Sequence, residues 1–242
     1  MTRPAAAPIL VAALSIAACG APSLDHDGDG RVTVVCLGDS NTRGGILYPE
    51  ADGWCERLGA SLPPATWRTI NRGRNGATAC DPGRPPDGTG EPLVAAELLA
   101  RALAGDHPDV VIVAFVTNDV ILGCTVEATL AALHALARTV EGSGAVPLIA
   151  LGPPILPPGT SATVTGWNAE LDEIDARIRA EFPAGAIIDF ASGMTSRDFA
   201  VDGIHVTGAA QARRTEAARR ALVSLAGLSP FALGPAPSPE TQ

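Results

Sequence analysis

The chain has 242 residues, of which 46% are hydrophobic, and a formal net charge of −9. This length supports one sizeable hydrophobic core and leaves little room for a second full domain. All 17 basic residues are arginines, interleaved with acidic residues and not gathered near aromatic ones, so the composition argues against binding to nucleic acid.

The N-terminus is typical of an export signal. Arg3 precedes an apolar stretch of small residues at 5–18, which is shorter than the roughly 20 residues that a membrane span needs. Residues 16–20, with the sequence IAACG, resemble a bacterial lipobox, which predicts that 1–18 is a lipoprotein signal peptide and that Cys19 is lipidated. Ordinary secretion is the alternative. We expect an exported protein that is held to a bacterial membrane only by its N-terminal lipid.

A polar tether is predicted for residues 19–30. Its DHDGDG run resembles the start of an EF-hand calcium loop, but the twelfth position of that loop is Cys36 instead of glutamate and falls inside a predicted strand. Two interpretations of Asp25, Asp27 and Asp29 therefore stay open, a solvated linker and a calcium site, and the pattern favours the linker.

After the tether, apolar runs of strand length alternate with helical patterns. The predicted strands are 32–37, 66–70, 110–115, 146–151 and 186–190. The predicted helices, in which Ala and Leu recur at three- and four-residue spacing, are 52–62, 91–104, 126–141, 165–182 and 207–227. These repeats predict one doubly wound α/β domain at 31–227 with a parallel sheet. Residues 228–242 are rich in proline and predict a disordered tail.

Four cysteines remain besides Cys19. Outside the cytoplasm they allow three full disulfide pairings, and their spacings do not match a zinc site. Cys80 and Cys124 both follow predicted strand ends, so we favour that pair. The alternative is four small buried thiols, which include Cys36 and Cys55.

Ser40 stands directly after the first predicted strand, in a Gly-Asp-Ser turn. Open parallel sheets place their sites at the carboxyl ends of the strands, where the strand order reverses. In the order 2-1-3-4-5, the loops after the second and third strands flank Ser40, and they contain Gly76 and Asn118. A glycine N–H and a side-chain amide can both donate to a developing oxyanion. Taken alone, Gly76 would be read as a turn and Asn118 as a loop cap.

A base for Ser40 is found by elimination among four histidines. His26 lies in the tether, His107 is expected at the opposite edge of the sheet, and His134 falls within a helical pattern, so none of them is expected near Ser40. His205 remains, just before the last predicted helix. Asp202 lies three residues upstream, where it can accept from one ring nitrogen and leave the other facing Ser40.

Together these residues resemble the blocks of the SGNH, or GDSL, hydrolase family. The blocks are Gly38-Asp39-Ser40 with Thr42 and Gly44, Gly76 in an N-x-G-x-x-G loop, Asn118-Asp119, and Asp202-x-x-His205, in family order. The resemblance implies a flavodoxin-like three-layer α/β fold with a five-stranded parallel sheet, and ester hydrolysis without a metal or cofactor. It implies Ser40 as the nucleophile, His205 as its base and Asp202 as the orienting carboxylate. The implied oxyanion donors are the N–H groups of Ser40 and Gly76 and the side chain of Asn118.

Details of the blocks refine the expected substrate. The Asn41-Thr42 pair resembles bacterial aryl- and acetylesterases, which favours short acyl groups. Val116 occupies the glycine position of the third block, where a valine can crowd the nucleophile's turn or narrow the acyl pocket. The arginines near the site, which favour an anionic substrate unless they are ordinary surface residues, are Arg43, Arg72 and Arg74.

Three other functions compete with ester hydrolysis. The first is an acyltransferase that uses the same triad with a sugar or alcohol acceptor. The second is a non-catalytic ligand-binding protein on the same scaffold. The third, a nucleotide-binding flavodoxin-like protein, would need a phosphate loop, which residues 73–76 do not provide. We expect a monomer that acts on a small ester or on an acylated carbohydrate or lipid.

Overall fold

The computed structural model describes residues 24–44, 49, 52–83, 93–159 and 161–227. The predicted signal peptide at 1–18, the lipidation site Cys19 and the predicted tail at 228–242 lie outside these residues. Within the described ranges, no helix is long and apolar enough to cross a membrane.

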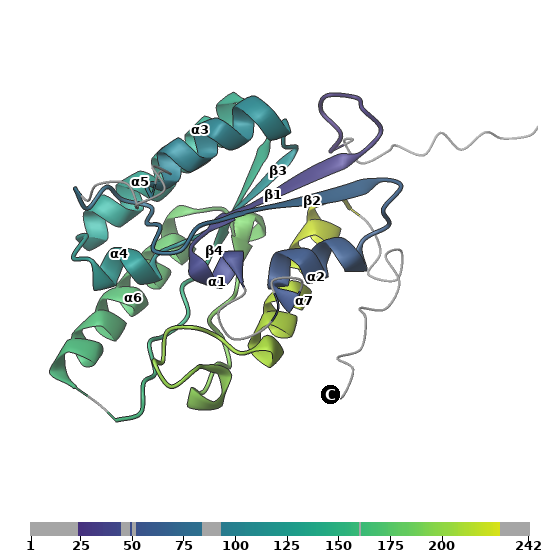
Figure 1. Ribbon diagram of the computed structural model, residues 1–242. Helices are drawn as coiled ribbons and strands as arrows, with labels where there is room; N and C mark the ends of the chain where they lie inside the picture. The colour runs from purple at the N-terminus through teal and green to yellow at the C-terminus, as the bar shows by residue number, and fades with distance from the viewer. Residues whose placement is uncertain (1–23, 45–48, 50–51, 84–92, 160, 228–242) are drawn as a thin grey trace, which may run out of the picture.

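The core of the molecule is a five-stranded parallel sheet with the order β2-β1-β3-β4-β5 (Figure 1), so the predicted fold class is confirmed. Its strands are β1 (Val32–Gly38), β2 (Trp67–Gly73), β3 (Val110–Ala114), β4 (Val146–Ala150) and β5 (Ile187–Ile188). The register sets Gly38 beside Gly73 on one side and beside Ala114 on the other. Three strands therefore end at one level, next to Ser40.

Within the described residues, five long α-helices and two short ones accompany the strands, and the last of them follows β5. They are α1 (Ser40–Arg43), α2 (Trp54–Ser61), α3 (Ala95–Asp106), α4 (Thr117–Ile121), α5 (Val126–Gly142), α6 (Ala162–Glu181) and α7 (Gly208–Leu225). Two 3₁₀ turns, η2 (Ala184–Ala186) and η3 (Ser196–Asp198), follow α6. The long helices match the predicted ranges. The short helices α1 and α4 occupy segments that the sequence analysis treated as loops.

The sheet separates two hydrophobic clusters, and side chains of β1 alternate between them. Val35 and Leu37 pack with residues of α3, α5 and α6 on one face. Val34 and Cys36 pack with residues of α2 and α7 on the other face. Figure 1 shows these helices on opposite sides of the strands. Burial on both faces explains why the central strands read as continuous apolar runs.

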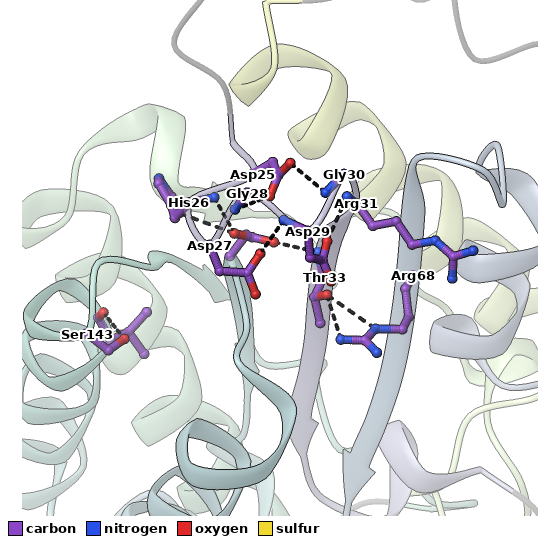
Figure 2. Close-up of polar contacts among 12 residues, drawn as sticks. Asp25, His26, Asp27, Gly28, Asp29, Gly30, Arg31, Thr33, Arg68 and Ser143 are labelled. Atoms are coloured by element: carbon purple, nitrogen blue, oxygen red, sulfur yellow. Dashed lines mark hydrogen bonds and ion pairs between the residues drawn. The ribbon is translucent and has the colours of Figure 1, made fainter.

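The described part of the predicted tether packs against the amino-terminal end of the sheet (Figure 2). Asp25 accepts the N–H groups of Gly28 and Gly30, which closes a tight exposed turn. Asp109 accepts the N–H of His26 at 2.7 Å and that of Thr33 at 2.7 Å, so this carboxylate joins the turn to β1 and β3. One carboxylate oxygen from each of Asp25, Asp27 and Asp29, the acidic residues of the DHDGDG run, lies within 4.8 Å of the other two.

Two disulfide bonds tie loops and helices to the sheet. Cys36 of β1 is bonded to Cys55 of α2, inside the cluster that includes α7. Cys80, in the loop after β2, is bonded to Cys124, which follows α4. The second bond therefore links the two loop regions that flank Ser40.

Candidate active site

The nucleophile turn begins where β1 ends. Asp39 caps α1 by accepting the N–H of Asn41 at 2.8 Å, and this places Ser40 at the first helical position. Gly38 must be a glycine, because a Cβ there would lie 2.1 Å from Oγ1 of Thr42 and 2.6 Å from the carbonyl of Ala114. The chain therefore turns sharply, and Ser40 stays 7% exposed at the end of the sheet.

A second turn, at residues 200–205, carries the candidate base. The N–H of Ala200 donates a hydrogen bond to the carbonyl of His205 at 2.7 Å, and the N–H of Gly203 donates to the carbonyl of Ala200 at 2.9 Å. We call residues 200–205 the base turn. Oδ1 of Asp202 accepts the N–H groups of Ile204 at 2.9 Å and His205 at 3.0 Å. The carboxylate thus fixes its own turn, just before α7.

Ser40, His205 and Asp202 come together in one chain of polar contacts. Oγ of Ser40 lies 3.0 Å from Nε2 of His205, and Nδ1 of His205 lies 2.6 Å from Oδ2 of Asp202. A carboxylate facing Nδ1 requires the proton on that nitrogen, which leaves Nε2 to accept from the serine hydroxyl. Burial works to raise the pKa of Asp202, but the hydrogen bonds from His205 and the Ile204 N–H outweigh it and lower that pKa.

Asp198 is a second carboxylate in the same segment, but it has other partners. It accepts the N–H of Thr195 at 2.8 Å and the Thr195 hydroxyl at 3.1 Å, and it forms an ion pair with Arg213 of α7. Its backbone carbonyl receives the N–H of Thr207 at 2.8 Å. These contacts hold the start of the segment, whereas Asp202 contacts the imidazole.

The other three histidines lie where the sequence analysis placed them. His26 sits in the N-terminal turn beside Asp109. His107 is the C-cap of α3, with a left-handed φ of 47°, at the entry to β3. His134 of α5 contacts Glu181 at 2.7 Å and stacks on Phe182. Among the four, His205 alone has a hydrogen bond to Ser40 in the described structure.

Two of the three predicted oxyanion donors, Gly76 and Asn118, follow the strands on either side of β1. Gly76 has a φ of 74°, a conformation that glycine adopts without strain. Asn118 lies in α4, and its Nδ2 donates to the carbonyl of Ala77 at 3.0 Å. An amide carries two hydrogens and this bond uses one of them. The contact joins the Gly76–Ala77 loop directly to the start of α4.

Asp119 is a buried carboxylate that the sequence analysis did not single out as functional. Its oxygens accept the N–H groups of Ala79 at 3.0 Å, Cys80 at 2.7 Å and Val116 at 3.2 Å. Burial raises the pKa of Asp119, and these backbone bonds act in the opposite direction. Asp119 therefore ties the loop after β2 to the first turn of α4, next to Asn118.

Val116 adopts a backbone conformation that is unusual for a β-branched residue. Its φ is 83°, the region that favours glycine. The side chain is 1% exposed and belongs to the cluster that contains α3, α5 and α6. Cγ2 of Val116 would lie 2.3 Å from a Cβ added to Gly152. The valine therefore fills space left by Gly152 in the core of the α/β sandwich.

Arg72, one of the three arginines predicted near the site, is paired with an acidic residue, and Asp39 is buried near another arginine. Arg72 makes a two-pronged contact with Asp106 of α3, at 2.7 and 2.5 Å, which accounts for its charge without a substrate. Asp39 is 4% exposed, and burial raises its pKa to about 6 although the nearby Arg214 guanidinium works to lower it. Arg214 is itself buried and lies over the ring of Phe190.

Several polar residues around the nucleophile were not predicted from the sequence. Asn71 donates to the carbonyls of Thr42 and Arg43, at 2.9 and 3.3 Å, and so holds the end of α1. Asn41 contacts the backbone on both sides of His205. The sequence signal for these contacts is the position of each asparagine: Asn41 comes directly after Ser40, and Asn71 follows the second predicted strand. A side-chain amide that is wholly or partly buried at such a position needs a hydrogen-bond partner.

The chain matches one protein-family model, the GDSL-like lipase/acylhydrolase family, over residues 36–213. No curated protein sequence matches it. A carbohydrate acetylesterase from Sinorhizobium meliloti is similar in structure, with 22% identity and a TM-score of 0.67 over 81% of this chain and 100% of that one.

Two further solved structures share the fold. An aryl esterase from M. smegmatis is 21% identical, with a TM-score of 0.63 over 80% of this chain and 99% of that one. A lipolytic protein of the G-D-S-L family from Veillonella parvula is 20% identical, with a TM-score of 0.61 over 78% of this chain and 97% of that one. The family match spans most of the chain and includes Ser40 and His205. The chain therefore belongs to the GDSL-like lipase/acylhydrolase family and is a carboxylic ester hydrolase.

Proposed function

We propose that this protein hydrolyses short acyl esters through an acyl-enzyme on Ser40, with His205 as the base and Asp202 as its orienting carboxylate. One observation carries the proposal: the continuous contact from Oγ of Ser40 to Nε2 of His205, at 3.0 Å, and from Nδ1 to Asp202, at 2.6 Å. This arrangement supplies a nucleophile, a base and a group that fixes the tautomer of that base.

The reaction follows from this contact chain in two steps. His205 takes the hydroxyl proton at Nε2 while Oγ of Ser40 attacks the ester carbonyl, and the N–H groups of Ser40 and Gly76 and the amide of Asn118 stabilise the oxyanion. The imidazolium then gives its proton to the leaving alcohol, and the acyl group stays on Ser40. In the second step His205 removes a proton from water, and the water oxygen attacks the acyl carbon. The bond to Oγ of Ser40 breaks, the imidazolium returns its proton to Oγ, and the carboxylic acid leaves.

Two likenesses favour short acyl groups. The Asn41-Thr42 pair resembles that of bacterial aryl- and acetylesterases. The fold is similar to those of a carbohydrate acetylesterase and an aryl esterase.

The proposal is tested with a panel of esters that varies the acyl group from acetyl upward and includes an acetylated polysaccharide. We expect turnover to fall steeply beyond short chains. Ser40→Ala should lower kcat on the order of 10⁶-fold and should abolish labelling by a fluorophosphonate. Wild-type turnover in Ser40→Ala would refute the assignment of the nucleophile, and a preference for long chains would refute the substrate class.

We further propose that the protein is exported and lipidated at Cys19. The two disulfide bonds support an oxidising compartment, because such bonds are rare in the cytoplasm of most organisms. Labelling with a radioactive fatty acid should mark the wild type and not Cys19→Ser. Equal labelling of both forms, or of neither, would contradict lipidation at this residue.

A further inference from the structure

Asn41, the residue after the nucleophile, contacts the segment that carries His205. Its Nδ2 donates to the carbonyl of Ile204 at 3.1 Å, and its Oδ1 accepts the N–H of Val206 at 3.0 Å. These are the residues on either side of His205. One amide therefore holds both backbone neighbours of the proposed base, across more than 160 positions of sequence.

The backbone of Asn41 is anchored as well. Its N–H donates to Asp39 at 2.8 Å, and its carbonyl accepts Nε2 of Gln211, in α7, at 2.9 Å. Asn41 is 4% exposed and Gln211 is fully buried. The side chain thus projects from a fixed point at the end of β1, and its amide can set the position of whatever it binds.

The other backbone contacts of the base turn do not connect it to the nucleophile helix α1. Asp202 binds the N–H groups of Ile204 and His205, and these bonds shape the turn without relating it to Ser40. Gly203 accepts the N–H of Leu156 at 2.8 Å, which holds the outer end of the turn. The amide of Asn41 joins the nucleophile helix to the backbone beside His205.

We propose that Asn41 is a positioning residue that sets the distance between Ser40 and His205, an inference that rests on the proposed function of that pair. Without the amide, the base turn keeps its internal shape but loses its attachment to α1. A misplacement of about 1 Å between reacting groups can lower a rate on the order of 10²-fold. The loss should fall on kcat, because the amide is occupied by backbone groups and not by substrate.

The test compares Asn41→Leu with a matched control. Leucine is close to asparagine in size and removes both side-chain bonds. Asp109→Leu likewise removes two bonds from a buried side chain to backbone N–H groups, those of His26 and Thr33. It does so at the opposite end of the sheet, since Thr33 and Gly38 are five residue steps apart along β1, roughly 16 Å. We expect both variants to lose thermal stability and only Asn41→Leu to lose kcat, by 10-fold or more, with KM within a few-fold of wild type.

Two further measurements keep the test decisive. Asn41→Asp preserves the size of the side chain and the acceptor for Val206 but not the donor for Ile204, and it should also lower kcat. The ¹⁵N resonance of Nε2 of His205 should change in the Asn41 variants and not in Asp109→Leu, and this signal requires no turnover. The proposal is overturned if folded Asn41 variants keep wild-type kcat and Nε2 resonance, or if Asp109→Leu loses kcat equally. A wild type without Ser40-dependent turnover would instead refute the proposed function, while the resonance would still report on Asn41.

Discussion

The carboxylate of Asp119, in α4, accepts the backbone N–H of Cys80 at 2.7 Å. The same side chain accepts the N–H groups of Ala79 and Val116, at 3.0 and 3.2 Å. It therefore binds the loop that carries Gly76 to the helix that carries Asn118. Together with the bond from Asn118 to the Ala77 carbonyl and the Cys80–Cys124 disulfide, this buried carboxylate sets the relative placement of two of the three proposed oxyanion donors.

Asp119→Ala should lower both stability and activity. It leaves three buried N–H groups without their acceptor, which costs about 1–3 kcal/mol for each group that stays unsatisfied. Asn118→Ala removes the proposed donor and one hydrogen bond, to the Ala77 carbonyl. It should cost roughly 2.7–4 kcal/mol of transition-state stabilisation and less folding stability than Asp119→Ala, which removes three bonds. Thermal unfolding and steady-state kinetics of both variants provide the comparison. Wild-type kcat in a folded Asp119→Ala would show that this carboxylate does not place the oxyanion donors.

The disulfide between Cys80 and Cys124 spans the same two regions and should contribute to both properties. The sequence separations of 44 and 19 residues predict losses of about 4 kcal/mol for Cys80→Ser/Cys124→Ser and about 3 kcal/mol for Cys36→Ser/Cys55→Ser. Only the first pair adjoins the oxyanion segments, so its removal should also lower kcat.

The matched control for this prediction is the Cys36→Ser/Cys55→Ser variant, assayed well below its melting temperature. If it loses as much kcat as Cys80→Ser/Cys124→Ser, the effect on activity is a general result of lower stability. Mild reductant should act first on Cys124, which is 8% exposed and lines a cavity of about 450 Å³, because Cys36 and Cys55 are at most 1% exposed.

The sequence predicted the sheet and the catalytic contact chain for separate physical reasons. Continuous apolar runs such as Val110–Ala114 are characteristic of strands buried on both faces, so their positions were clear. The second strand is predicted to end at residue 70, whereas β2 continues to Gly73. The polar residues Asn71 and Arg72 end the apolar pattern, but β2 lies at the edge of the sheet, where polar side chains are tolerated. His205 was identified because so few histidines compete with it.

The parts of the site that escaped prediction depend on tertiary contacts. The N-cap of the helix α4 is Val116, whose N–H donates to the carboxylate of Asp119. Val116 has a positive φ, and no local sequence pattern predicts that a helix starts at such a residue. The amide of Asn41 meets the backbone beside His205 only after the chain has folded. Cysteine spacing likewise left the Cys36–Cys55 pair as one possibility among several, since pairing follows from strand and helix placement.

Asp202 and Asp198 can be separated by isosteric substitution. Asp202→Asn places an amide against Nδ1 of His205 and disfavours the tautomer that leaves Nε2 free to accept, so kcat should fall on the order of 10⁴-fold. Asp198→Asn removes the charge that faces Arg213 and should mainly lower stability. Steady-state kinetics and thermal unfolding of the two variants show which of the two carboxylates orients His205. A larger loss of kcat in Asp198→Asn would transfer the orienting role to that residue.

The stability of the protein should depend on pH through Asp175 of α6. Its carboxyl accepts the N–H of Gly152 at 2.9 Å, and burial raises its pKa from 3.8 to about 7. Between those values the folded state holds a proton that the unfolded state releases, so the stability it contributes is full at low pH and is lost as the pH rises toward 7. Asp175→Asn stays neutral and lacks this loss.

The free energy of unfolding, measured by urea denaturation between pH 4 and 8, tests the prediction. The difference between Asp175→Asn and wild type should shift in favour of the variant as the pH rises, and should level off above about pH 7. Glu173→Gln, which neutralises an exposed carboxyl on the same helix, controls for the loss of one negative charge. A pH-independent difference for Asp175→Asn would rule out the raised pKa.

The packing of Val116 against Gly152 couples substitutions at these two positions. A Cβ at position 152 would lie 2.3 Å from Cγ2 of Val116, so alanine at 152 requires the valine side chain to move or to be replaced by a smaller one. A smaller residue at 116 removes this close contact and lowers the cost of enlarging residue 152. The effect of a mutation at either position therefore depends on which residue stands at the other.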